Sequence, residues 1–386
     1  MGKTGFVDRW FPTYSQYPES RLFSLDVLRG LDMILLTVIG PVVRAAQKSW
    51  ECFPPAMMDQ MRHNWTGFTL WDIIMPLFIF MCGAAIPFAL GRRLREGRGV
   101  FWRHVLARVA LLWVMGGMVQ GNWAAMNPLT FSPFANTLQS IAVGYLATAF
   151  LMTLRTEALR VAIPIALAAA YAAIMALFGD YSQHGNIAFK IDHAIFSAIL
   201  PAENEYVAKP SYYAWVLPSM MFAAMTMCGY HASEILRRQW SGKSKALVLF
   251  GGSAALFSVG IVSSIWIPVI KPVYSLSFTA LAMGWCVLLL AALYVACDIW
   301  KIRRGTALVL LFGQCALTAY FVSHFFSAPL ASLAETLMQS ARVHFSPALA
   351  SFLVAVCKTA MLVAVMVAWR RLKASVTLIP DFCKGG

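Results

Sequence analysis

Apolar runs of about 20 residues recur along almost the whole of this sequence and constrain its fold more than any other feature. A helical run of that length matches the hydrocarbon core of a bilayer. Of the 386 residues, 60% are hydrophobic and 12% are charged, whereas roughly a quarter are charged in a soluble domain. Because a soluble core cannot bury so much apolar surface, the sequence predicts an all-α, polytopic membrane protein.

The apolar runs predict about ten transmembrane helices. Their approximate ranges are 23–44, 67–90, 101–120, 136–154, 159–178, 213–233, 245–267, 274–298, 306–328 and 347–369. The connections that follow even-numbered runs are rich in Lys and Arg, whereas the connection at 179–212 is net acidic. Because basic residues collect on the cytoplasmic side of membrane proteins, we expect both termini to be cytoplasmic.

This topology predicts one domain with two long external loops. A cytoplasmic segment at 1–22 precedes a single transmembrane domain at 23–370, and a cytoplasmic tail follows at 371–386. The external loops span about 45–66 and 179–212. The same inner-side excess of basic residues explains the net charge of +14, so no nucleic-acid partner is expected. The eight cysteines lack metal-ligand spacing, and we expect neither a metal site nor a disulfide framework.

Three charged residues interrupt the first apolar run, where an ionisable group is costly unless it is paired or hydrated. Asp26, Arg29 and Asp32 fall within about 120° of one helix face. Two interpretations stay open: Arg29 receives an anionic part of a substrate while Asp26 orients it, or the charges form an internal ion pair that holds the helix in place. Lys358 lies midway along the last run, and a pairing with Asp32 is one explanation for it.

Histidines at the predicted outer face form a second informative group. His63 immediately precedes the second run, and Asp72 follows it nine residues later. A histidine near a carboxylate is an arrangement expected of a general base for an amine or hydroxyl. Asp72 has an alternative interpretation as a charge that favours a helix N-terminus. His324 lies at the outer end of the ninth run.

Several motifs carry a family resemblance. Two of them read R-L-F-S-L-D-V-L-R-G at 21–30 and H-N-W-T-G-F-T-L-W-D-I-I-M-P-L-F-I-F-M-C-G at 63–83. Further along are Thr137-Leu138-Gln139, I-P-V-I-K-P-V-Y-S-L-S at 267–277, and Ser323-His324. In this order the motifs resemble the heparan-α-glucosaminide N-acetyltransferase family and its bacterial relatives, and the similarity covers residues from about 21 to 330.

The resemblance implies a transmembrane acyltransferase. The family transfers an acetyl group from cytosolic acetyl-CoA to the free amine of a terminal glucosamine, and its catalytic histidine matches His63. We therefore expect acetyl-CoA as co-substrate, an amino sugar or glycan as acceptor, membrane lipid as the surroundings, and no metal. A homodimer is compatible with this interpretation. The large external N-terminal domain of the lysosomal members has no counterpart here, which leads us to expect a bacterial inner-membrane protein.

The candidate site residues fall into three groups. They are His63 and Asp72 for catalysis; Arg29, Asp26, Gln139, Lys271, Ser275 and Ser277 for contacts with acetyl-CoA; and Asn64, Trp65, Asn122 and His324 for contacts with the acceptor. His63 acts either as a general base or as a transient acetyl carrier, and the sequence does not choose between these roles.

Two departures from the family leave the acceptor open. The chain has Ser140 after Leu138-Gln139, where the family has arginine, and Tyr213-Ala214-Trp215-Val216 replaces the family's D-P-E-G. The main alternative function is a secondary transporter for an anionic or sugar substrate, but the sequence shows neither inverted repeats nor paired interrupted helices. A non-catalytic membrane scaffold is a third interpretation, which leaves the charges in the first run unexplained.

Overall fold

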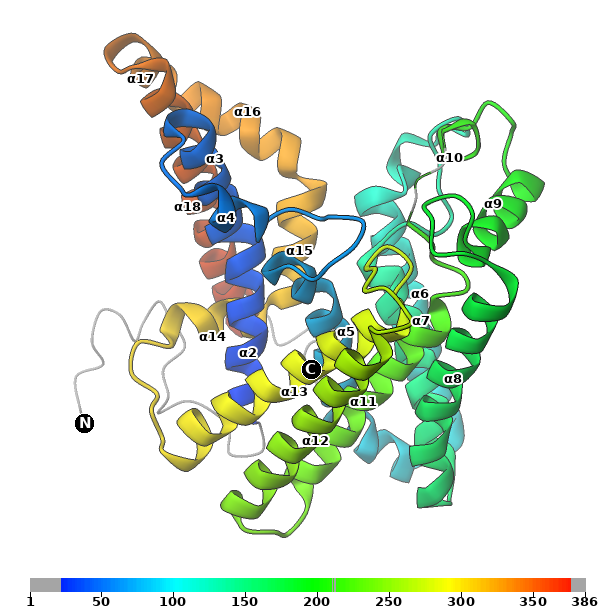
Figure 1. Cartoon of the computed structure of the whole chain (residues 1–386). Coiled ribbons are helices and arrows are strands. Elements are labelled where there is room, and N and C mark those ends of the chain that lie inside the picture. Colours follow the sequence, from blue (N-terminus) through cyan, green and yellow to red (C-terminus); the bar gives the residue numbers. More distant parts are fainter. Residues whose placement is uncertain (1–21, 210, 212, 376–386) are drawn as a thin grey trace, which may run out of the picture. The chain divides into compact units, whose positions relative to one another are not determined.

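The computed structural model describes residues 22–209, 211 and 213–375. Most of the predicted cytoplasmic segment at 1–22 and of the predicted tail at 371–386 lies outside the described residues. Throughout the described ranges the regular secondary structure is helical, without a strand (Figure 1). The predicted all-α class is therefore confirmed.

Contacts within the chain define two compact units. Unit 1 takes its described residues from Met1–Arg62 and Ala292–Lys384, and unit 2 takes them from His63–Ala291. Each unit is considered by itself below. The prediction of a single domain over 23–370 stays a prediction.

Unit 2 contains most of the apolar helices. Its elements are η3 (Leu70–Ile73), α5 (Ile74–Glu96), α6 (Arg98–Gln120), η4 (Trp123–Ala125), α7 (Thr137–Thr153), α8 (Glu157–Phe178), α9 (Ile187–Ile199), α10 (Glu205–Ala208), α11 (Ser219–Arg237), α12 (Gly242–Ser263) and α13 (Leu276–Leu293), whose last two residues belong to unit 1. The two predicted external loops hold short helices, which are α9 and α10 in the case of 179–212.

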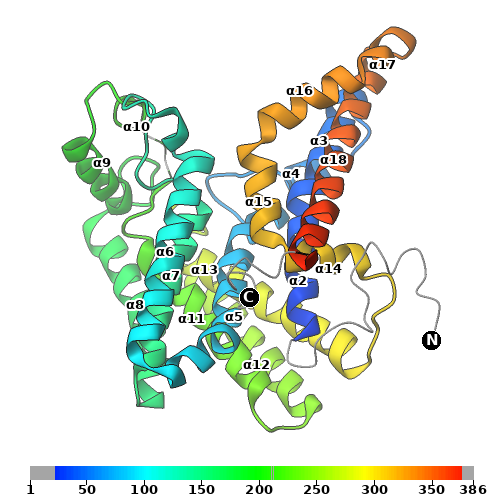
Figure 2. The ribbon, with the colours of Figure 1, turned by 180° about the vertical axis from the view of Figure 1, so that it is seen from behind.

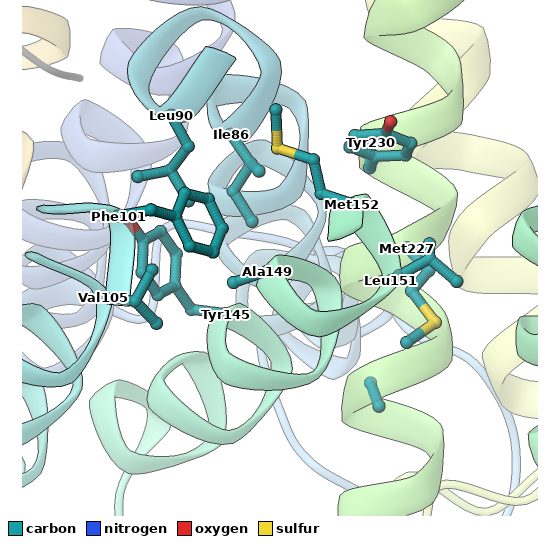
Figure 3. Close-up of a cluster of buried hydrophobic side chains, with 11 residues drawn as sticks. Ile86, Leu90, Phe101, Val105, Tyr145, Ala149, Leu151, Met152, Met227 and Tyr230 are labelled. Atoms are coloured by element: carbon teal, nitrogen blue, oxygen red, sulfur yellow. The ribbon is translucent and has the colours of Figure 1, made fainter. Parts of the chain in front are cut away.

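Close backbone approach and a large apolar cluster hold unit 2 together. Gly83 of α5 lies against the Thr226 carbonyl of α11, and Gly229 of α11 lies against the Phe80 carbonyl of α5, so a methyl group at either glycine would overlap the other helix. Such small residues allow helix backbones to pack tightly in lipid. Figure 3 shows the buried cluster, in which Phe101 and Tyr145 from α6 and α7 join side chains of α5 and α11.

Unit 1 is built from the two ends of the described chain. Its elements are α2 (Phe23–Ile34), η2 (Leu35–Ile39), α3 (Gly40–Trp50), α4 (Pro55–Asp59), η5 (Tyr294–Ile299), α14 (Ala307–Gln314), α15 (Ala316–Phe325), α16 (Ser327–Leu337), α17 (Gln339–His344) and α18 (Pro347–Ser375). Helix α18, drawn in red, lies along α3, drawn in blue (Figure 2). Gly30 packs on the Val309 carbonyl and Gly313 on the Asp26 carbonyl, which brings α2 and α14 into close contact.

Six helices of the described chain are long and apolar enough to cross a membrane, and the pair α14–α15, bent by 79°, would make a seventh. The six are Leu70–Glu96, Arg98–Gln120, Glu157–Phe178, Gly242–Ser263, Leu276–Ile299 and Pro347–Leu372. These helices indicate a membrane protein. The predicted runs at 23–44, 136–154 and 213–233 also fall on helices, namely α2 to α3, α7 and α11. The count of ten spans stays a prediction.

Candidate active site

His63 lies in a loop of unit 2. Hydrogen bonds attach this loop to two other segments of the same unit. The Gly67 N–H donates to the Val269 carbonyl at 2.8 Å. Gly67 has φ of +104°, a left-handed conformation that glycine adopts without steric cost. The Trp65 Nε1–H donates to the Tyr181 carbonyl at 3.1 Å. The loop is therefore fixed against the segment 267–275 and against the start of the loop at 179–212.

Asp72 is held by the residue that precedes the second apolar helix. The Thr69 backbone N–H and the Thr69 hydroxyl both donate to Asp72 Oδ2, at 3.0 and 2.8 Å. This is the reciprocal capping arrangement that a T-x-x-D sequence forms at a helix N-terminus. Only 1% of Asp72 is exposed. Its second oxygen, Oδ1, is left to accept from other groups.

Lys271 reaches Asp72 from a loop between α12 and α13. That loop is closed by Ser275, whose N–H donates to the Ile270 carbonyl and whose hydroxyl accepts from the Ile270 N–H. The Tyr171 hydroxyl also donates to the Val273 carbonyl. These bonds explain how a flexible lysine side chain is kept buried, with 5% of the residue exposed.

The three side chains form one compact cluster. Asp72 Oδ1 lies 2.7 Å from His63 Nδ1 and 3.2 Å from Lys271 Nζ. Lys271 Nζ lies 3.1 Å from His63 Nδ1. Burial lowers the pKa of Lys271, and the nearby carboxylate of Asp72 opposes that shift. Because Asp72 is acceptor-only when ionised, it is the shared acceptor for the ammonium and the imidazole.

This arrangement selects one tautomer of His63. An ionised carboxylate has acceptors and no donor, so Nδ1 must carry the proton that is shared with Asp72 Oδ1 at 2.7 Å. With Nδ1–H donating to Asp72, the Nε2 atom carries the free lone pair. The His63 side chain is 38% exposed, whereas the side chains of Asp72 and Lys271 are 2% and 6% exposed. The cluster therefore presents an oriented imidazole to the surroundings and can take a proton or attack a carbonyl.

The other predicted residues of unit 2 are engaged in local structure. Ser277 donates to the Pro268 carbonyl at 3.0 Å, and Ser275 closes the Lys271 loop. Gln139 donates to the Pro133 carbonyl at 2.8 Å and accepts from the Ala135 N–H at 2.9 Å. Their predicted contacts with acetyl-CoA gain no support from this geometry and stay predictions. Asn122 has a φ of 53° and lies in an exposed turn that follows α6.

The loop motif that differs from the family is anchored by Asp192. Its two carboxyl oxygens accept from the Trp215 and Val216 N–H groups at 2.6 and 3.0 Å. Burial raises the pKa of Asp192 to about 7, against these two hydrogen bonds, which favour the charged form. The segment is therefore held by a buried carboxyl from α9.

The charged residues of the first apolar run lie in unit 1. Arg29 Nη1 is 3.2 Å from Asp26 Oδ1, so these two residues form the internal ion pair that was one of the two interpretations. Their predicted contacts with acetyl-CoA stay predictions. Lys358 donates to the Ser327 hydroxyl at 2.8 Å, and the suggested pairing of Lys358 with Asp32 is wrong. His324 Nδ1 lies 2.9 Å from the Tyr320 carbonyl and from Ser323 Oγ.

Sequence reasoning identified His63 and Asp72 but missed what completes their cluster. The T-x-x-D pattern at Thr69 and Asp72 was a readable signal for the capping contact. The pairing of Lys271 with Asp72 had no local signal, since the two residues come from separate loops. Asn64 and Trp65 directly follow His63 in the sequence, and Asn64 is exposed. Within the described ranges there is no group of three or more His, Cys, Asp or Glu side chains that could hold a metal ion.

Comparison with known families gives a match over the first part of the chain. Residues 21–118, which include His63 and Asp72, match the family described as a domain of unknown function (DUF5009). No curated protein matches the chain. The matched stretch covers the first helix of unit 1 and the loop that carries the imidazole, and it ends before Lys271.

Proposed function

We propose that this protein is a membrane acyltransferase that moves an acetyl group from acetyl-CoA to the amine of an extracytoplasmic amino sugar or glycan. The observation that carries the proposal is the His63–Asp72–Lys271 cluster. A buried carboxylate that orients a partly exposed histidine is the arrangement that general bases and nucleophilic histidines need. The resemblance of the surrounding motif to the heparan-α-glucosaminide N-acetyltransferase family supplies the substrate class.

In the direct route, His63 Nε2 removes a proton from the sugar ammonium. The resulting amine attacks the thioester carbonyl, the C–S bond breaks, and CoA leaves as a thiolate. The attacking nitrogen gives its surplus proton to the departing thiolate, and the imidazolium returns its proton to water. Asp72 stabilises the imidazolium that forms, because its carboxylate already accepts from Nδ1. Lys271 keeps Asp72 in its charged form through the ion pair at 3.2 Å.

In the covalent route, Nε2 itself attacks the thioester carbonyl, the C–S bond breaks, and CoA leaves as a thiolate. The acetyl group stays on Nε2 until the deprotonated sugar amine attacks it; the bond from the acetyl carbon to Nε2 then breaks, and the surplus proton of the new amide nitrogen passes to the imidazole. The same oriented lone pair serves both routes, so the geometry favours neither. The two routes differ in kinetics: ping-pong behaviour and a trapped acetyl-histidine belong to the covalent route.

The membrane placement belongs to the same proposal. Ten spans with both termini in the cytoplasm would put the His63 loop and the loop at 179–212 on the outer side of a bacterial inner membrane. Cys52 is exposed and lies on the predicted outer side, whereas Cys383 is predicted to be inside. A membrane-impermeant maleimide should label Cys52 in intact cells and label Cys383 after lysis only. Labelling of Cys383 in intact cells would contradict this topology.

A secondary transporter remains the second candidate, and one observation favours it. Helices α14 and α15 form a span broken at Cys315, with an angle of 79° between them. Interrupted helices line the binding sites of many transporters, where they usually come in pairs. A transporter would not consume acetyl-CoA.

The test of the proposal is the reaction of the purified full-length protein with acetyl-CoA and glucosamine. We expect release of free CoA together with N-acetylglucosamine in equal amounts. A second assay with the protein in liposomes, acetyl-CoA inside and glucosamine outside, tests transfer across the bilayer. Movement of intact glucosamine or of intact acetyl-CoA, without any acetylated product, would replace the acyltransferase with the transporter.

A further inference from the structure

Asp32 differs from the other buried carboxyl groups of the described chain and from the half-buried Asp298. Asp26, Asp72, Asp192 and Asp298 each accept a hydrogen bond or pair with a cation. Asp32 is 3% exposed, and neither of its carboxyl oxygens has a hydrogen-bond partner among the described residues. The group lies in α2, and the acyltransferase cluster in unit 2 makes no use of it.

The cost of burying a charge decides the state of this carboxyl group. An ionised carboxylate without a counter-charge or a donor is strongly destabilised in an apolar interior, whereas the neutral acid costs far less. Ionisable groups inside membrane helices are therefore retained mainly where they carry a function. The described packing thus favours a carboxyl group that carries its own proton.

The titratable groups on the helices around α2 provide no alternative partner. Helix α14 and segment η2 contribute no charged side chain. From η5, Asp298 accepts from the Ser24 N–H and pairs with Arg303. From α15, His324 lies against Tyr320 and Ser323. On α2 itself, Arg29 pairs with Asp26. The proton on Asp32 is therefore not replaced by an ion pair with any of these groups.

The backbone near Asp32 is irregular in two places. Directly after the helix that holds Asp32, the chain changes to the π-helical segment η2, and such segments are frequent at functional sites. Helix α14 packs on α2 through Gly30 and Gly313 and is itself broken at Cys315. These two irregular segments lie directly after α2 and at the end of α14, so they border the contact between the two helices.

We propose that Asp32 is a proton-binding site of unit 1, which exchanges its proton with water when the α2–α14 contact opens. In the exchange, the carboxyl O–H bond breaks, the proton passes to water and a carboxylate remains until a proton returns. A metal cation needs several oxygen ligands around it. A proton fits this site better, because the two oxygens of Asp32 have no hydrogen-bond partner among the described residues. The inference goes beyond acyl transfer and does not depend on it.

Infrared difference spectroscopy of the full-length protein tests this proposal. The spectrum of the wild type minus that of Asp32→Asn, both at pH 7, should contain a carboxylic-acid C=O band that shifts after transfer to deuterated water. The matched control, Asp26→Asn, should remove carboxylate bands instead, because Asp26 is paired with Arg29. If the Asp32 difference contains no acid band, or contains one that never shifts in deuterated water, the proposal is overturned.

Carbodiimide labelling gives a second measurement that needs no variant to fold. The Asp32 oxygen adds to the carbon of dicyclohexylcarbodiimide while its proton moves to the reagent nitrogen, and the adduct is found by mass spectrometry of the peptide. We expect an adduct on Asp32 and none on Asp26, with less labelling as the pH rises. If added sodium ions suppress the labelling at constant pH, the site binds sodium and the proton assignment is wrong.

Discussion

Asp72 and Asp32 are equally deep in their respective units, yet their surroundings are opposite. Asp72 is 1% exposed and receives hydrogen bonds or an ion pair from Thr69, His63 and Lys271. Asp32 is 3% exposed and has no described partner. Burial alone therefore does not define the role of a carboxyl group in a membrane helix.

The number of hydrogen-bond donors around a buried carboxyl group decides what that group can do. With several donors Asp72 stays charged and can orient an imidazole throughout a reaction cycle. With none, Asp32 is stable only as the neutral acid, and a change in its surroundings can release its proton. One residue positions a reacting group, and the other is itself the group that changes state.

Among the buried carboxyl groups and their partners, the largest effect is expected from replacing Asp72. In Asp72→Asn the buried ammonium of Lys271 loses its counter-charge, which should lower the free energy of unfolding by about 3 kcal/mol. Acetyl transfer should fall about 100-fold or more, because the amide no longer fixes the tautomer of His63. Thermal unfolding in detergent and initial rates of CoA release measure the two effects.

The matched variant Asp32→Asn replaces a neutral acid with a neutral amide, and it should change the unfolding free energy by less than about 1 kcal/mol. Equal losses of stability in the Asp72 and Asp32 variants would contradict the proposed difference between these two carboxyl groups.

A smaller effect is expected from removing Lys271. In Lys271→Met, Asp72 keeps its bonds from His63 and Thr69, so transfer should fall only about tenfold. If Lys271 acts by positioning, the pH profile of the rate should change shape, and Lys271→Arg should restore most of the rate and the profile. A Lys271→Met protein with unchanged rate and pH profile would show that the ion pair is structural only.

The smallest effect concerns Asp192. Its carboxyl group has two backbone donors, which is fewer than Asp72 has and more than Asp32 has. Its pKa is raised to about 7 by burial, so the folded protein binds its proton more tightly than the unfolded chain does. The stability from this proton is fully present below about pH 4 and is lost as the pH rises through about 7. We expect the melting temperature of the wild type, relative to that of Asp192→Asn, to fall over this interval. A difference that stays constant with pH would mean that the two hydrogen bonds hold Asp192 ionised.

Much of the helical framework could be predicted from the sequence, because apolar periodicity and length are local properties. The runs at 67–90, 101–120, 159–178 and 245–267 correspond to α5, α6, α8 and α12. The break at Cys315 was not predicted, since the run at 306–328 contains no proline and no Asp, Glu, Lys or Arg.

Within the candidate site, the sequence revealed the parts that are close together along the chain. His63 and Asp72 are nine residues apart, and the structure shows the hydrogen bond between them. Lys271 is 208 residues from His63, and its position depends on how the loop at 267–275 packs. For the same reason the suggested pairing of Lys358 with Asp32 was wrong. Opposite charges in two predicted spans suggest an ion pair, but only packing decides whether the two side chains come into contact.

The most direct test of the account is the rate of acetyl transfer from acetyl-CoA to glucosamine by His63→Ala. A suitable control is His184→Ala, because His184 belongs to the loop at 179–212 of the same unit, which is predicted to be external, and packs on Phe189. We expect transfer by the His63 variant to fall by a factor of about 100 to 10,000 while its melting temperature is retained, and the His184 variant to keep its rate. If His63→Ala transfers acetyl groups as fast as the wild type, His63 is not the reacting group and the proposed mechanism is wrong.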